Sequence, residues 1–67
     1  MLNPSYAHFV SYRRYEDDKF ASTNIVHATS LANIDREFEG YAWYSIRWAP
    51  DAEVEAARAK GMPERWV

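Results

Sequence analysis

The sequence predicts an α+β fold, in which a small three-stranded antiparallel sheet carries helices packed mainly on one of its faces. Aromatic and β-branched residues gather in three short segments, which is typical of strands. Apolar residues at helical spacing lie between the second and the third of these segments. A proline followed by acidic residues then indicates the start of a second helix. At 67 residues we expect one domain that spans residues 1–67.

The first two predicted strands form a hairpin. Residues 6–15, YAHFVSYRRY, are rich in aromatic and β-branched residues and contain neither glycine nor proline. The acidic cluster at residues 16–19 predicts a solvated turn, and residues 20–28 predict the returning strand. Apolar residues from about residue 24 also recur near helical spacing, so a longer helix that begins there is the alternative.

A first helix is predicted over residues 30–39. Leu31, Ile34 and Phe38 fall on one face of such a helix, and the serine or threonine before Leu31 suits the N-cap. The helix therefore has an apolar side that can cover the sheet.

The third strand is predicted over residues 41–49 and a second helix over residues 51–60. Pro50 suits the position before a first helical turn, and acidic residues follow it where the helix dipole favours negative charge. Residues 61–67 form a C-terminal tail that is too short for an element of its own. The element order is thus ββαβα, and a helical crossover places the third strand beside the first, in the spatial order 2-1-3.

Alternation along residues 41–49 divides the segment into two sets of side chains. Tyr44, Ile46 and Trp48 form an apolar set that we expect under a helix, while Trp43 and Arg47 lie in the opposite set.

Alternation also divides residues 6–15 into two sets of side chains, and each set ends in a polar residue. We expect Phe9 to point inward, which leaves Tyr12 and Arg14 beside the set of Trp43 and Arg47. The alternative is that the second helix or Trp66 covers Trp43.

This arrangement predicts an open aromatic and basic sheet face that contacts a partner. Tyr, Trp and Arg are enriched among the residues that dominate binding energy at protein interfaces. The predicted partner-binding residues are Tyr12, Arg14, Tyr41, Trp43 and Arg47. We therefore interpret the chain as a non-catalytic protein–protein interaction module with a protein partner, a second copy in a homodimer, or both.

Composition limits the other function classes. Ten acidic and eight basic residues give a net charge of −2, which does not favour strong attraction to nucleic acid. The chain has no cysteine, so it has no thiolate ligand for a metal. The first ten residues lack the basic and apolar regions of a secretory signal, and no apolar run is long enough to cross a membrane. We expect a cytoplasmic protein without cofactor or metal.

Two other function classes remain as alternatives. Aromatic rings and arginines on a sheet can bind single-stranded nucleic acid, although the glycine–aromatic signature of common RNA-binding sheets is absent. A small enzyme that uses His8 or His27 is the second alternative, but no nucleophile motif frames a serine. Short chains without catalytic motifs are often phage or mobile-element accessory proteins that bind and inhibit a host protein complex, and size alone suggests that role here.

Overall fold

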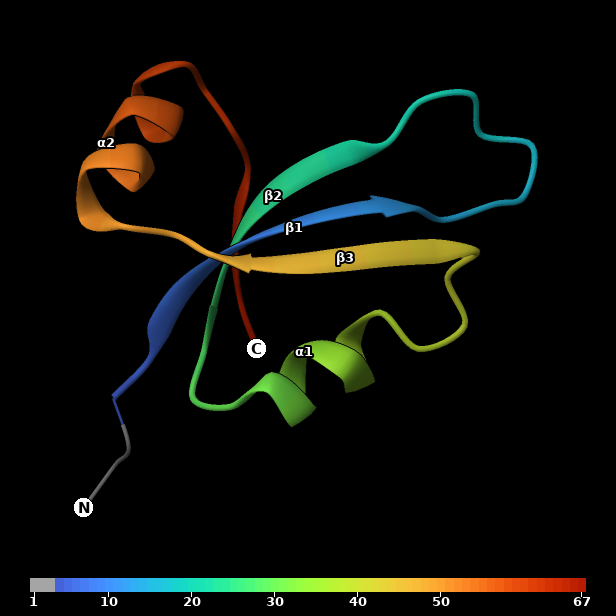
Figure 1. Ribbon diagram of the computed structural model, residues 1–67, viewed down its shortest axis with the longest axis horizontal. Helices are drawn as coiled ribbons and strands as arrows, with labels where there is room; N and C mark the ends of the chain where they lie inside the picture. Colours follow the sequence, from blue (N-terminus) through green and yellow to red (C-terminus); the bar gives the residue numbers. More distant parts are fainter. Residues whose placement is uncertain (1–3) are drawn as a thin grey trace.

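The computed structural model describes residues 4–67 and has a mixed four-stranded sheet with two helices (Figure 1). The strands are β1 (Tyr6–Arg13), β2 (Ser22–Ala28), β3 (Trp43–Trp48) and β4 (Glu64–Trp66), and the helices are α1 (Leu31–Glu37) and α2 (Asp51–Ala59). The strand order in the sheet is β3-β1-β2-β4. The α+β class is confirmed, whereas the expectation of only three antiparallel strands is wrong. Residues 1–3, part of the segment examined for a secretory signal, lie outside the described residues.

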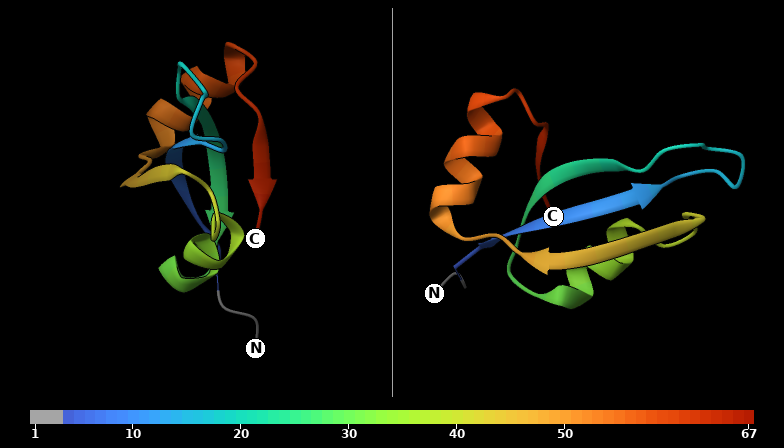
Figure 2. Two further views of the ribbon diagram at one scale, coloured as in Figure 1. Left: turned by 90° about the vertical axis from the view of Figure 1, so that its right-hand side faces the viewer. Right: turned by 45° about the horizontal axis from the view of Figure 1, so that its top comes forward.

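The centre of the sheet is an antiparallel hairpin of β1 and β2, and β3 pairs antiparallel with the other side of β1. These three strands have the expected order 2-1-3. The hairpin loop projects from one end of the molecule (Figure 2). In this loop the carboxylate of Asp18 accepts hydrogen bonds from the backbone N–H groups of Arg14 and Tyr15, at 3.1 and 3.0 Å. The segment that could have begun a long helix is instead β2.

The C-terminal tail forms β4, which pairs in parallel with β2. The backbone N–H of Ile25 donates to the carbonyl of Pro63 at 2.9 Å, and that of Val67 donates to the carbonyl of His27 at 2.9 Å. The prediction that the tail is too short for an element is therefore wrong. A strand of three residues gives no alternation pattern in the sequence. Its partner β2 is distant along the chain.

Each face of the sheet buries an apolar cluster under one helix. On one face, α2 contributes Val54 to a cluster with Phe9 and Ile25. On the other face, α1 contributes Ile34 to a cluster that includes Val10. Phe9 and Val10 point to opposite faces because side chains alternate along a strand. The helices lie on either side of the strands in Figure 1, so the expectation of helices mainly on one face is wrong.

The predicted grouping of side chains across β1 and β3 is also wrong. Phe9 lies opposite Arg47, and Val10 lies opposite Ile46. Phe9 therefore shares a face with Arg47, whereas Tyr12 shares the other face with Ile46. Alternation defines two sets of side chains within each strand, but the register between strands decides which sets share a face. That register was not visible in the sequence.

The first turn of α1 is fixed by a side-chain cap. The backbone N–H of Asn33 donates to Oγ of Ser30 at 3.3 Å, which makes Ser30 the N-cap. Gly40 follows the helix with a φ of 87°, a conformation that other residues rarely adopt. Neither helix of residues 4–67 has the length and apolar character needed to cross a bilayer.

Candidate functional site

The five predicted partner-binding residues do not share one surface. Trp43 and Arg47 lie on the face that α2 partly covers, because they share it with Phe9. Tyr12 and Tyr41 pack against the α1 cluster on the opposite face. No single flat partner surface can therefore contact all of these side chains.

Tyr12 and Tyr41 belong to an aromatic group around the buried side chain of Phe38. The Phe38 ring centroid lies 5.3 Å from that of Tyr12 and 5.0 Å from that of Tyr41. The guanidinium of Arg65 lies over the rings of Tyr12 and Phe38, at 5.6 and 5.0 Å. These contacts give both tyrosines a role in packing. The remaining residue of the predicted set, Arg14, is exposed beside the Tyr41 ring at 5.7 Å.

Trp43 and Arg47 are exposed, but they have neighbours within the chain. Trp43 is 42% exposed, and the guanidinium of Arg13 lies 6.0 Å from its ring centroid. The guanidinium of Arg47 lies 4.5 Å from the ring centroid of Phe9 and 3.4 Å from a carboxylate oxygen of Glu53. Neither α2 nor the tail buries Trp43, so the alternative in which they cover it is not the one observed.

One hollow of the described surface lies on the α1 face, beside the end of β3. It has a volume of about 360 Å³ and is lined by His8, Leu31, Ile46, Arg47 and Trp48. We call it the Trp48 pocket. Its size falls within the range of roughly 300–1,000 Å³ that is common for ligand pockets.

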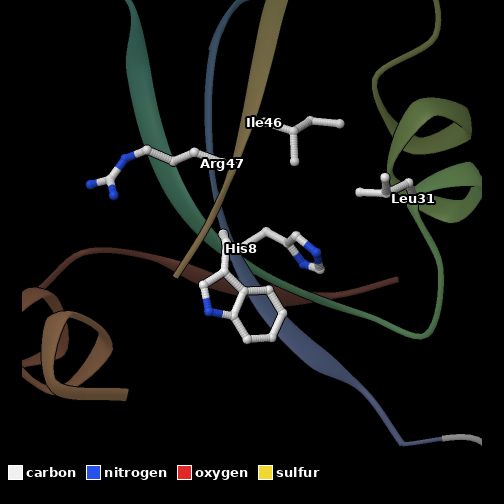
Figure 3. A pocket seen from close by; sticks show the side chains of 5 residues that line it. His8, Leu31, Ile46 and Arg47 are labelled. Atoms are coloured by element: carbon white, nitrogen blue, oxygen red, sulfur yellow. The ribbon is translucent and has the colours of Figure 1, made fainter. Parts of the chain in front are cut away.

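The walls of the Trp48 pocket are apolar. Leu31 and Trp48 are 57% and 58% exposed, although both are large apolar side chains. Figure 3 shows the Leu31 and Ile46 side chains around the imidazole of His8, while the guanidinium of Arg47 points away from them. Exposed apolar groups that meet around a hollow are typical of an interaction site.

His8 is the polar group of this pocket. The residue is only 8% exposed, and its Nδ1 is the one buried side-chain nitrogen or oxygen of residues 4–67 without a hydrogen-bond partner. Its ring meets the Trp48 ring edge-on, with the centroids 5.8 Å apart. Buried polar groups are nearly always hydrogen-bonded, so a buried nitrogen without a partner among these residues is unusual.

β3, which contributes Ile46, Arg47 and Trp48 to the Trp48 pocket, also has an outer edge. β3 is an end strand of the sheet, and within the described part of the chain only β1 pairs with it. Its six residues, WYSIRW, include neither proline nor lysine, which proteins often use to protect such edges. Its charged residue is Arg47, so the outward backbone groups of β3 have no strand partner within residues 4–67 and are flanked by one exposed charge.

A second cluster joins α2 to β4 on the opposite face. A carboxylate oxygen of Glu64 lies 2.7 Å from Nε2 of His27. The same carboxylate accepts two hydrogen bonds from Arg58, one from Nε and one from Nη2 at 3.1 Å. The hydrogen bond from Arg58, with a second one from His27, lowers the pKa of Glu64 to about 2. The ring of Trp66 stacks on His27 at 4.5 Å. This cluster holds β4 against the rest of the fold.

The two histidines lie apart on the two faces of the sheet. His8 pairs with Val26 across the hairpin, whereas the next residue of β2, His27, pairs with Ala7. The structure therefore does not bring His8 and His27 into one site. Among residues 4–67, no three His, Asp or Glu side chains come together as a metal site.

Sequence reasoning missed the pocket because it placed Trp48 in the core. The lengths of the predicted elements indicate that the strand is longer than the helix that covers it, since a helix rises about 1.5 Å per residue and a strand about 3.3 Å. A helix over residues 30–39 can therefore cover only about half of a strand over residues 41–49. The end of the strand, where Trp48 lies, is left uncovered.

No family model, curated protein or solved structure matches the chain. Its function must therefore be argued from the Trp48 pocket and the neighbouring strand edge.

Proposed function

We propose that the chain is a non-catalytic protein-binding module that pairs an extended segment of a partner protein with the free edge of β3. The observation that carries this proposal is that the apolar Trp48 pocket is lined by Ile46 and Trp48 of β3, the strand that has the free edge. Added strands gain affinity from backbone hydrogen bonds and gain specificity from pockets that take alternate side chains. Here the edge of β3 would supply the backbone hydrogen bonds, and the Trp48 pocket would take a side chain of the partner.

The exposed side chains around the pocket support a protein partner. Tyr6 and Trp48 are both exposed, and their ring centroids lie 5.8 Å apart. Rigid aromatic side chains of this kind commonly anchor protein interfaces. The proposal keeps the predicted class of function and moves the contact surface from Trp43 and Arg47 to Trp48.

Nucleic-acid binding receives less support. Tyr12 and Trp43, the rings expected to stack bases together, belong to strand positions on opposite faces of the sheet. They cannot form one continuous stacking platform. The role of inhibitor of a host protein complex rests on the size of the chain alone and stays a prediction.

Affinity capture from the native host tests the proposed surface. The bait proteins are the wild type, Trp48→Ala and the matched control Trp43→Ala, each checked for folding by circular dichroism. We expect the wild type and Trp43→Ala to recover the same partner and Trp48→Ala to lose it. Equal recovery by all three folded proteins would contradict the proposal. Loss of the partner with Trp43→Ala alone would also contradict it, because that result would support the surface predicted from the sequence.

A further inference from the structure

We propose that the strand that pairs with the free edge of β3 is β3 of a second copy of this chain. The two strands run antiparallel about a two-fold axis at Ile46, so that two four-stranded sheets join into one. This inference rests on the proposed function and names the partner. It is drawn from the order of side chains along β3, from the exposure of Trp48 and from the place of Arg47.

Two-fold symmetry restricts how β3 can pair with itself. In a two-fold dimer, if one residue lies opposite a second, then the second lies opposite the first. Residues directly opposite each other in a sheet have side chains on the same face, so the axis must pass through a residue of β3 and not between two. Among its six residues, axes at Ser45 and at Ile46 pair the most of the strand. The first axis leaves Trp48 unpaired, and the second leaves Trp43 unpaired.

The side chains of β3 on the α1 face are arranged symmetrically about Ile46. An aromatic residue, Tyr44, lies two positions before it, and another, Trp48, lies two positions after it. An axis at Ile46 therefore sets Tyr44 opposite Trp48 of the second copy and Ile46 opposite its own equivalent. Aromatic and β-branched pairs across two strands stabilise a sheet. Pairing with an identical strand requires such a symmetric order, whereas pairing with an unrelated segment does not.

The charge of β3 is compatible with this axis. Arg47 is the one charged residue of the strand, and an axis at Ile46 places it opposite Ser45 of the second copy. Like charges directly opposite each other destabilise a sheet, and this register avoids an opposed pair of arginines. Each copy also offers the other the same row of backbone groups, which have no strand partner within residues 4–67.

Exposure favours the axis at Ile46 over the axis at Ser45. Trp48 is 58% exposed and Trp43 is 42% exposed. The axis at Ile46 pairs the more exposed of these two rings with an aromatic partner, and it does so twice because of the symmetry. Exposed aromatic side chains that meet a partner at an interface commonly dominate its binding energy.

Analytical ultracentrifugation of the wild type tests whether the chain pairs with itself. We expect the measured mass to rise with protein concentration from that of one chain to that of two. Trp48→Ala should weaken the dimer by about tenfold or more, since it removes an aromatic anchor from both copies. Trp43→Ala is the matched control and should leave the dissociation constant unchanged, because an axis at Ile46 leaves Trp43 unpaired.

Single-cysteine variants locate the axis. The chain has no cysteine, so an introduced thiol can form a disulfide only with its equivalent in a second copy. A residue on the axis lies opposite its own equivalent, with Cβ atoms about 5 Å apart, which is close to the separation in a disulfide. Under mild oxidation we expect Ile46→Cys to form a linked dimer faster than Ser45→Cys. The control Phe20→Cys, in the exposed hairpin loop, should be the slowest of the three.

Three results would overturn this inference. They are a monomer at every concentration, a dimer that Trp48→Ala does not weaken, and faster linkage through Ser45→Cys or Phe20→Cys than through Ile46→Cys. Failure of the proposed function is distinguishable from each of these. A monomer that still captures another protein through Trp48 would exclude the second copy and leave the proposed function in place. The mass measurement uses the wild type, so it stays decisive even if a variant does not fold.

Discussion

At the scale of single residues, the fold depends on a few polar contacts whose strength varies with pH. Glu64 is the clearest case, because Arg58 and His27 both contact its carboxylate. The ordinary pKa of a glutamate is 4.5, and these contacts lower that of Glu64 to about 2. A lowered pKa in the folded state means that the ionised carboxylate stabilises the fold.

This linkage predicts how stability changes in acid. The contribution of Glu64 is fully present above pH 4.5, the ordinary pKa, and is lost as the pH falls through about 2. Glu64→Gln should therefore be less stable than the wild type at pH 6, and the difference should shrink as the pH approaches 2. Urea unfolding at several pH values measures this difference. A gap that stays constant down to pH 2 would show that the ionisation of Glu64 does not contribute.

His8 is a contrasting case, because its buried Nδ1 has no hydrogen-bond partner among residues 4–67. Such a nitrogen reduces stability in the free protein, since burial removes its hydrogen bond to water.

At the scale of elements, α1 is held to the sheet by Ile34 and by Phe38, the C-cap residue that ends it. Phe38 is fully buried, and the centroids of three tyrosine rings lie between 5.0 and 5.7 Å from its own. Removal of such a ring leaves a cavity that the aromatic neighbours cannot fill.

Phe38→Ala should lower the free energy of unfolding by about 3–5 kcal/mol, the range for large-to-small changes in a core. Phe20→Ala is the matched control, because Phe20 is 84% exposed and its loss should change stability by less than about 0.5 kcal/mol. Chemical denaturation of both variants measures the two values. Similar effects from the two substitutions would contradict the packing described for α1.

The elements also show what the sequence could and could not predict. The strand that contains Phe9 and the helix that contains Ile34 were predicted because their apolar spacing is regular over several residues. β4 was missed because three residues carry no period, and it depends on a partner strand distant in the sequence. Local patterns predict elements well, whereas pairing between distant segments requires the three-dimensional structure.

The same reasoning applies to the candidate site. Trp43 and Arg47 were correctly expected to be exposed, but Tyr12 was placed on their face because the strand register was unknown. Trp48 was assigned to the core because its set of side chains is apolar throughout. The lengths of the predicted helix and strand show that the helix covers only part of the strand, but no local pattern shows that the Trp48 end is the uncovered one.

At the scale of the whole molecule, the fold is a thin sheet whose two edges differ. One edge is β4, a strand of three residues beside the cluster of Glu64. The other edge is β3, with six residues and an apolar pocket beside it. Small domains have free energies of unfolding of only about 0.05–0.15 kcal/mol per residue, so a strand added by a partner would strengthen the whole sheet.

Amide hydrogen exchange in the complex with the captured partner tests the central claim most directly. The account predicts that the amides of β3 exchange more slowly in the complex, because their outward N–H groups bond to the partner strand, while those of β4 change little. Protection of β4 with β3 unchanged, or protection confined to the surface around Trp43, would contradict it.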